Sequence, residues 1–313
     1  MRPSNAMLTA STRLSPRSAE AGVRPPLEEP ASEAPAVERS PWRRLAGSLF
    51  RMPTAVGSGL VLLFWIVCAV LWPLIVPYNP TSPDYASAHL GPSLRHLSGT
   101  DIYGRDVFSR VLAGSREVLI MAPAATLIGL AGGITLGLLT AYYGGWLDEI
   151  VNRILEVVMT FPVIIVGLLV FSVFGPSSLN TVLLIGIVYI PIVSRVVRSS
   201  ALSIRSLDYV AAARLRGASG PSIMLTEILP NISGPILVEA TVRVGYAVFT
   251  TASLSFIGLG SGPDSTDWGT MIFAGKDYMA FYPWLILAPT VAIASLVVAL
   301  NLLSDGLRRA VSL

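Results

Sequence analysis

Six long apolar blocks constrain this chain more than any other feature of its sequence. They approach or exceed the length that an α-helix needs to cross a bilayer core of ~30 Å. Only 13% of the residues are charged and 53% are hydrophobic, whereas soluble domains carry about 25% charged residues. The pattern therefore predicts an all-α integral membrane protein with six transmembrane helices. The blocks cover residues 56–76, 118–143, 154–174, 179–193, 238–257 and 282–303.

The fourth block, residues 179–193, is the weakest of the six because it is short and has Pro191 close to its end. Its assignment as a span rests partly on its neighbours. Six spans would return the C-terminus to the side of the membrane on which the N-terminus lies.

The sequence between the blocks divides the chain into three parts. Residues 1–45 are rich in proline, serine, alanine and arginine, so this segment cannot bury enough apolar surface to fold and is predicted to be a disordered cytoplasmic tail. Residues 46–117 would contain the first transmembrane helix and an external segment. Residues 118–313 would form a core of transmembrane helices two to six, with a cytoplasmic loop at about residues 195–237.

The basic residues indicate the orientation. If the N-terminus is cytoplasmic, sixteen of the 22 basic residues lie on the cytoplasmic side and five lie outside. An excess of arginine and lysine on the cytoplasmic side is typical of membrane proteins. We therefore expect both termini to be cytoplasmic, and we interpret the pI of about 9.2 as a consequence of topology and not of nucleic-acid binding. The single cysteine, Cys68, excludes a disulfide framework within the chain.

Glycine recurs at every fourth position in the second block, at Gly129, Gly133 and Gly137. This spacing places three positions without side chains on one helix face, where the backbone of a neighbouring helix can come close. The pattern favours a role in helix packing. A hinge or a pore lining is the alternative interpretation.

The cytoplasmic loop is predicted to contain two short helices. The alanine run at residues 211–213 favours a first helix, and Gly217 is placed to end it. Ser219 or Gly220 can cap a second helix. Small residues thus form the turn between the two helices.

The second helix of this loop would carry a broad apolar stripe. Pro221 lies in its first turn, where the missing N–H has no cost, and Pro230 would stop the helix. An exposed helix pair of this kind makes a knob that can fit the groove of a partner protein. A helix pair lying on the membrane surface is the alternative. The stripe consists of Ile223, Met224, Leu225, Ile228 and Leu229.

The loop resembles the EAA loop of ABC-importer permeases, whose pattern is E-A-A, three residues, glycine, nine residues, I-x-L-P. The matching positions are Ala212, Ala213, Gly217, Leu229 and Pro230. Ala211 replaces the glutamate of the pattern, and Glu227 replaces its isoleucine. The resemblance therefore implies a helical knob here, but no ion pair from residue 211.

Three further stretches are similar to the C-type subunit of dipeptide, oligopeptide and nickel permeases. Residues 99–106 resemble the family's G-T-D-x-x-G-R-D segment, and residues 301–308 resemble its N-L-L-G-D-G-L-R ending. Residues 254–260, followed by Trp268 and Gly269, resemble its L-S-F-L-G-L-G…W-G stretch. The resemblance covers about residues 50–311 and leaves out only the N-terminal tail.

By this resemblance, the chain has the type I ABC-importer permease fold and is a permease subunit of an ATP-driven importer in the bacterial inner membrane. It would form half of the translocation pathway for peptides or similar small solutes. The implied partners are a second homologous permease, two ATP-binding subunits, an extracytoplasmic solute-binding protein and the lipid bilayer. ATP and Mg would be bound by the partner ATPases, and no cofactor by this chain.

The same resemblance implies two sets of site residues. The loop that couples the permease to the ATPases would use Tyr209, Ala212, Ala213, Arg214, Gly217, Leu229 and Pro230. The external family segment would use Gly99, Asp101, Gly104, Arg105 and Asp106. We expect the adjacent Arg105 and Asp106 to hold the external segment in shape and not to perform chemistry.

The sequence gives little support to a metal site or an enzyme. His89 and His96 lie in the external segment near Asp84 and Asp101, but their spacing is no ligand signature. Hydrolysis needs a nucleophile beside a base, and neither histidine lies in a span. We therefore predict neither a metal ion nor a catalytic site.

An ion-coupled secondary transporter or channel is the alternative function. It would require inverted repeats or ionisable residues at mid-membrane, and neither is clear in the sequence. Glu239 and Arg243 do lie within the fifth block, but they are four residues apart. Residues at this spacing share one helix face, so the two charges are expected to pair within the helix.

Overall fold

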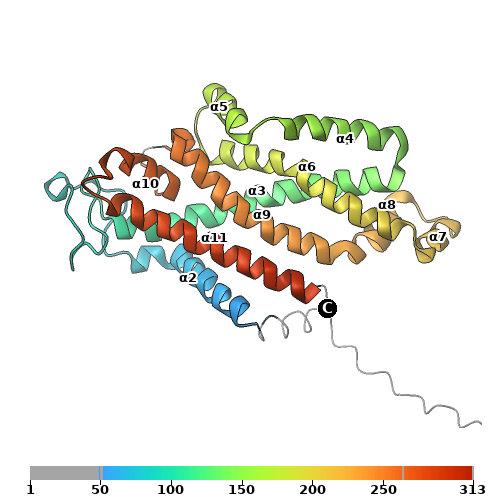
Figure 1. Cartoon of the computed structure of the whole chain (residues 1–313), viewed down its shortest axis with the longest axis horizontal. Helices are drawn as coiled ribbons and strands as arrows, with labels where there is room; N and C mark the ends of the chain where they lie inside the picture. The colour runs from blue at the N-terminus through green and yellow to red at the C-terminus, as the bar shows by residue number, and fades with distance from the viewer. Residues whose placement is uncertain (1–48, 50–51, 263, 312–313) are drawn as a thin grey trace, which may run out of the picture. The chain divides into compact units, whose positions relative to one another are not determined.

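A computed structural model describes residues 49, 52–262 and 264–311 of the chain. The described residues belong to one compact unit. The predicted disordered tail, residues 1–45, lies outside the described residues. The regular elements of the described part are helices, apart from an isolated bridge between Thr100 and Asp106 (Figure 1).

The longer helices are α2 (Pro53–Ile75), α3 (Val107–Tyr143), α4 (Gly145–Thr160), α5 (Val163–Phe174), α6 (Ser178–Arg205), α9 (Ser233–Leu254) and α11 (Trp284–Val311). The shorter helices are α7 (Asp208–Leu215), α8 (Gly220–Ser222) and α10 (Trp268–Gly275). Two π-helical turns are η2 (Ile223–Ile228) and η4 (Ser255–Leu259), and three 3-10 turns are η1 (Tyr85–Ser87), η3 (Pro230–Ile232) and η5 (Lys276–Tyr278).

Five helices of the described part are long and apolar enough to cross a membrane, and one bent helix pair can supply a sixth span. The predicted all-α fold is therefore confirmed. The second block begins earlier than predicted, because α3 starts at Val107. The fourth block, which is the weakest in the sequence, belongs to a helix that continues to Arg205.

The third block does not form one helix. Its residues are divided between α4 and α5, whose axes differ by 84°. Phe161 and Pro162 adopt extended backbone angles between them, with ψ of 127° and 128°. Proline disfavours the helical conformation of the residue before it, so the break falls at this dipeptide. The expectation of one continuous helix over residues 154–174 is wrong.

The contact between α3 and α6 is the most extensive helix contact in the described residues. A Cβ atom on Gly129 would lie 2.6 Å from Cβ of Tyr189, and one on Gly133 would lie 2.5 Å from Cβ of Val193. A Cβ atom on Gly137 would lie 2.8 Å from the carbonyl oxygen of Ser194. The two helices approach each other so closely that a side chain at any of these positions would require one of them to move.

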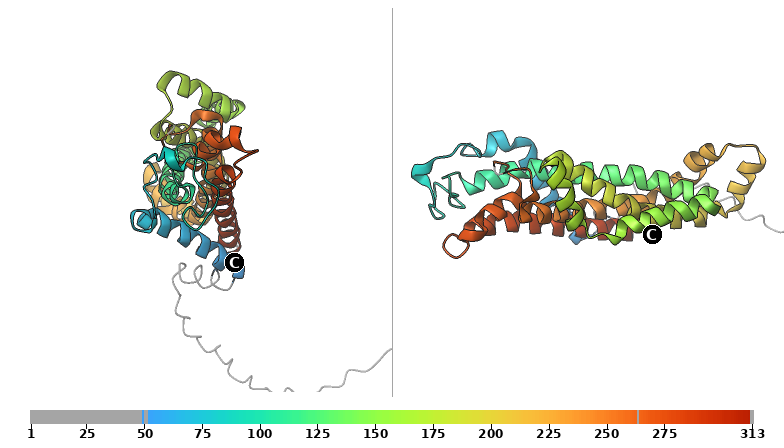
Figure 2. Two further views of the ribbon diagram at one scale, coloured as in Figure 1. Left: turned by 90° about the vertical axis from the view of Figure 1, so that its left-hand side faces the viewer. Right: turned by 90° about the horizontal axis from the view of Figure 1, so that it is seen from above.

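Two hydrophobic clusters stabilise the helices. The larger one joins α2, α3, α6, α9 and α11 around Trp268, which is fully buried. The smaller one joins the last turns of α3 and the second half of α6 to the segment between α6 and α9. That segment lies at the opposite end of the helices from the chain between α2 and α3, as Figure 1 and the right-hand view of Figure 2 show.

Candidate functional site

Residues 206–232, between α6 and α9, form two short helices that we name the helical hairpin. The first helix, α7, ends as the sequence predicts: Gly217 has a positive φ of 81°. Its N–H donates to the carbonyl of Arg214 at 2.9 Å, and the N–H of Ala218 donates to the carbonyl of Ala213 at 3.2 Å. This pair of bonds is the Schellman arrangement, which satisfies the last carbonyls of a helix and favours glycine at the left-handed position.

The second helix begins at the predicted cap. The Ser219 side chain accepts a hydrogen bond from the N–H of Ser222 at 3.4 Å, and Pro221 occupies the first turn. Pro230 ends the π-helical turn that follows, but it does not separate the hairpin from the next span by a loop. Instead, Pro230 opens the 3-10 turn η3, which leads directly into α9.

The apolar stripe of the second helix points mainly inward, toward the rest of the protein. Ile223 and Ile228 have no exposed surface, and Met224 is 6% exposed. They pack with Val210 and Ala213 of α7 in the smaller hydrophobic cluster. Burial of apolar side chains is the main source of stability in such a small element. The stripe therefore anchors the hairpin to α3 and α6.

The outer face of the hairpin carries a different set of side chains. Leu215 is 89% exposed at the end of α7, and Leu225 is 60% exposed. Arg214 and Arg216 flank Leu215, and the Arg214 guanidinium lies 4.9 Å from the ring centre of Tyr142 in α3. An apolar side chain between two arginines thus projects from the hairpin. The sequence pattern alone does not distinguish Leu215 from the buried residues around it.

The remaining residues of the predicted coupling set differ in their exposure. Tyr209 and Pro230 are exposed, Ala212 and Leu229 are half-buried, and Ala213 is buried. The structure brings all of them together in the hairpin. Ala213 serves its packing, whereas Tyr209 and Pro230 lie on its surface.

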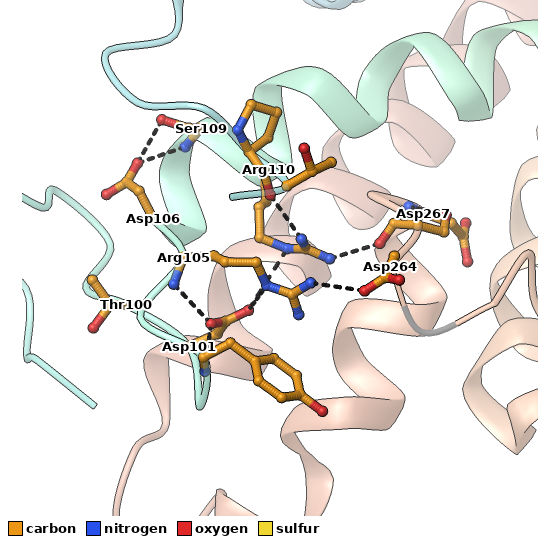
Figure 3. A network of polar contacts seen from close by, with 12 residues as sticks. Thr100, Asp101, Arg105, Asp106, Ser109, Arg110, Asp264 and Asp267 are labelled. Carbon is orange, nitrogen blue, oxygen red and sulfur yellow. Dashed lines mark hydrogen bonds and ion pairs between the residues drawn. The ribbon is translucent and has the colours of Figure 1, made fainter. Parts of the chain in front are cut away.

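A polar network occupies the opposite end of the helices (Figure 3). Arg105 donates from Nε to the Asp101 carboxylate at 2.7 Å, and its guanidinium lies 3.6 Å from the exposed carboxylate of Asp264. Arg105 does not form an ion pair with its neighbour Asp106; its carboxylate partners are Asp101 and Asp264. Both residues still hold the external family segment in shape, each through a different partner.

Asp106 is instead the cap of α3. Its carboxylate accepts from the N–H and the hydroxyl of Ser109 at 2.8 and 2.7 Å, and it lies 2.9 Å from Nδ1 of His96. His89 stacks on the ring of Tyr282 with 4.4 Å between the ring centres. Among the described residues, no group of three or more histidine, cysteine or carboxylate side chains could hold a metal ion.

Arg110, in the first turn of α3, joins two distant segments to this network. It donates to the carbonyl of Pro80 at 2.8 Å and to the carbonyl of Ser265 at 2.6 Å. A buried guanidinium needs several acceptors in place of water, and these two carbonyls supply them. Sequence reasoning missed this role because backbone carbonyls leave no signature in the sequence.

The backbone conformation of the external family segment requires glycine at two positions. Gly99 and Gly104 have φ values of 70° and 76°. A Cβ atom on Gly99 would lie 2.5 Å from Nε1 of Trp284, and one on Gly104 would overlap the carbonyl oxygen of Asp84. Only glycine fits such positions without strain. The segment is therefore folded tightly against the start of α11.

Two hydrogen-bonded ion pairs join residues of the long helices. Arg243 donates to Glu239 at 2.6 Å, as the four-residue spacing predicts. Arg198 of α6 binds Asp148 of α4 through two hydrogen bonds, of 2.7 and 2.5 Å. The second pair lines a polar cavity of about 900 Å³ between these helices. Fifty positions separate its members, so no local pattern in the sequence indicates it.

Asp267 is a buried carboxylate that caps α10. It accepts from the N–H and the hydroxyl of Thr270, each at 2.9 Å. Burial raises the pKa of this carboxyl above its ordinary value, and its hydrogen bonds oppose the shift only in part. The next residue, Trp268, is also buried and donates to the carbonyl of Val111 at 2.9 Å.

The raised pKa of Asp267 predicts a pH-dependent stability. The folded state binds the proton more tightly than the unfolded chain, so this contribution is fully present below the unfolded pKa of about 3.9. It is lost as pH rises through the folded pKa. We expect Asp267→Asn, which keeps an acceptor for Thr270, to raise the unfolding temperature relative to the wild type more at pH 8 than at pH 4.

Thermal unfolding of the purified protein across this pH range would measure the difference. The matched variant Asp267→Ala removes the cap and should lower stability by about 1 kcal/mol even at pH 4. An Asp267→Asn difference that stays constant from pH 4 to pH 8 would contradict the prediction.

The fold and its two ends define a class of protein. A bundle of helices long and apolar enough to span a membrane, with a stably anchored helical hairpin at one end, is typical of a transport permease. Residues 133–312 match the family described as binding-protein-dependent transport system inner membrane component. Residues 40–92 match the N-terminal transmembrane domain of oligopeptide transport permease C.

The chain belongs to this family of ABC transport permeases and is a permease subunit of an ATP-driven importer. It is 38% identical to a glutathione transport system permease protein of Pectobacterium atrosepticum over 273 residues, which cover 87% of this chain and 91% of the relative. It is 34% identical to a dipeptide transport system permease protein of Alkalihalophilus pseudofirmus over 290 residues, which cover 91% and 95%.

A solved structure shows the same fold. The inward-facing MetNI methionine ABC transporter matches with a TM-score of 0.54 over 64% of this chain and 96% of the matched chain, at 20% sequence identity. The type I importer permease fold predicted from the sequence is therefore confirmed. The family is one of multi-pass inner-membrane permeases and not a catalytic family.

Proposed function

We propose that this permease imports short peptides or peptide-like solutes, with the helical hairpin seated on a cytoplasmic ATPase. The observation that carries the coupling role is the hairpin itself: its apolar stripe is buried against α3 and α6, so that its outer face is held firmly in place. A movement of the ATPase that displaces this face would therefore also displace α3 and α6. The names of the relatives, permeases for glutathione and for dipeptides, support the substrate class.

The orientation and the partners belong to the same proposal. Both termini and the hairpin lie in the cytoplasm, where the excess of arginine favours them. The working importer contains a second homologous permease, two ATP-binding subunits that carry ATP and Mg, and an extracytoplasmic solute-binding protein. This chain contributes half of the pathway and binds no cofactor.

Leu215 offers a sharp test of the hairpin's role. A leucine that is 89% exposed between two arginines has the exposure expected of an anchor for a partner's pocket. Leu215→Asp should weaken binding of the ATPase subunits about tenfold or more, measured by their co-purification with the detergent-solubilised permease pair. ATP-driven uptake into proteoliposomes should fall in parallel.

Leu94→Asp is the matched control. Leu94 is 99% exposed and lies at the opposite end of the helices, so the same substitution should leave ATPase binding unchanged there. Equal ATPase binding by both variants and the wild type would count against the coupling role. Uptake driven by an ion gradient without ATP would instead support the alternative of a secondary transporter.

A further inference from the structure

A second cavity, of about 410 Å³, lies at the end of the helices opposite the hairpin. Its volume falls within the range of about 300–1,000 Å³ that is usual for small-molecule sites. Its walls come from the segment before α3, from the η4 turn and from α10 with the η5 turn that follows it. None of the site residues predicted from the sequence explains this cavity.

Two residues of opposite charge that are adjacent in the chain line the cavity. Lys276 and Asp277, adjacent in η5, both line it, and neither forms an ion pair with another described residue. The ammonium of Lys276 lies 3.7 Å from the ring centre of Phe273, which also lines the cavity. This cation–π contact fixes the position of the ammonium. The positive charge still has no paired anion among the described side chains.

The other walls are mainly apolar and aromatic or formed by glycine backbone, and they include the polar residues Ser255 and Thr270. Tyr103, Phe273 and Tyr278 contribute aromatic surface, and the Arg105 guanidinium supports Tyr103 from 4.6 Å. Gly258 and Gly262 contribute a wall without side chains and have φ values of 88° and 107°. The cavity thus combines two opposite charges with aromatic surface.

In the larger polar cavity between α4 and α6, four of the six charged side chains are paired, and the two that form no ion pair within the described part of the chain, Glu149 and Arg195, come from different helices. Its Asp148 and Arg198 are already bound to each other. The cavity beside α2 is lined mainly by apolar side chains, with Arg116 among them. Among these cavities, the one at Lys276 is distinguished by an ammonium and a carboxylate on adjacent residues, both unpaired within the described residues, which suits a small ligand that carries both charges.

We propose that this cavity binds a zwitterionic peptide of about dipeptide length, with its carboxylate on Lys276 and its ammonium on Asp277. Consecutive Cα atoms are about 3.8 Å apart, and an extended chain spans at most about 3.6 Å per residue. The side chains of two adjacent residues, Lys276 and Asp277, can therefore contact both charged ends of a dipeptide. The ends of a longer extended peptide would lie too far apart. The peptide's side chains would contact the rings of Phe273 and Tyr278. This inference rests on the proposed peptide-import function and adds a substrate contact on the permease itself.

The test uses the assembled transporter in nanodiscs without its solute-binding protein, so that only the membrane subunits are available to the peptide. The probe is alanyl-alanine, and the control ligand is N-acetyl-alanyl-alanine amide, which has the same backbone but neither terminal charge. Binding is measured by isothermal titration. Lys276→Gln and Asp277→Asn should each weaken alanyl-alanine binding about tenfold, because each removes a charge-assisted hydrogen bond.

Two control variants separate this effect from a general change of charge. Lys276→Arg keeps the positive charge and should retain binding within about threefold. Glu149→Gln removes a negative charge from an exposed carboxylate that lines the other polar cavity and not this one, and it should leave binding unchanged. In the wild type, the capped peptide should bind at least about tenfold more weakly than alanyl-alanine.

The inference would be overturned if the wild type bound both peptides equally, if Lys276→Gln changed nothing, or if alanyl-alanine did not bind at all. ATP-driven uptake by the complete system is measured in parallel. Uptake of alanyl-alanine without binding at this cavity would reject the site and leave the proposed function standing. Binding that depends on Lys276, but no ATP-driven uptake, would support the site and reject the proposed function.

Discussion

Replacing Gly217 with valine should reduce ATP-driven uptake by about five- to thirtyfold while the protein still inserts into the membrane. Gly217 has a φ of 81°, and a Cβ atom there would meet nothing within 4 Å. The penalty therefore comes from the backbone alone, at about 1–2 kcal/mol for a left-handed residue. A change of this size shifts a local folding equilibrium about five- to thirtyfold. Uptake into proteoliposomes and the amount of protein in the membrane fraction would measure the two effects.

Gly217→Asn is the control, because asparagine adopts the left-handed conformation more readily than other residues with a side chain. It adds a side chain of similar size to valine but should keep most of the uptake. Wild-type uptake by both the asparagine and the valine variant would show that the Schellman turn is not needed for coupling. If both variants lost uptake equally, contact of the partner with this position would be the cause instead.

The same alanine substitution should have opposite effects at two helical glycines. A Cβ atom on Gly133 would lie 2.5 Å from Cβ of Val193 and 2.9 Å from the backbone nitrogen of Ser194, whereas one on Gly57 would meet nothing within 4 Å. Gly133→Ala should destabilise the protein by about 1–3 kcal/mol, since α3 and α6 must separate. Gly57→Ala should be neutral or stabilising by up to about 1 kcal/mol, because alanine favours the helix.

Thermal unfolding of the two variants in the same detergent would compare them directly. A Gly133→Ala protein with wild-type stability and no uptake would contradict the packing role that we propose for Gly129, Gly133 and Gly137. That result would favour a hinge or a pore lining. If Gly57→Ala also lowered the unfolding temperature, helix propensity would not explain the effect of alanine at that position.

Local features of the fold could be predicted from the sequence. The Schellman turn at Gly217 and the cap at Ser219 depend on backbone conformations and hydrogen bonds within a few residues. The pairing of Glu239 with Arg243 depends only on the geometry of one helix. Each of these is confirmed because its physical cause is contained in a short stretch of chain.

Other features required the tertiary structure. The stripe with Ile223 and Ile228 is apolar, but the sequence does not show whether it meets its own helices or a partner; only its packing against α3 and α6 decides. Asp101 and Asp106 are both close enough in the sequence to pair with Arg105. Asp106 instead caps α3, and Arg105 pairs with Asp101. The Asp148–Arg198 pair joins two helices whose approach no local pattern indicates.

The sequence by itself determined that this is a membrane protein of helical spans, with a hairpin between two of them. Apolar blocks of bilayer length must leave water, and glycine and proline limit the backbone wherever the chain runs. Only the tertiary structure decided which face of the hairpin is free, where the third block bends by 84° and which charges meet. These depend on contacts between distant segments, and such contacts form only when the helices have packed together.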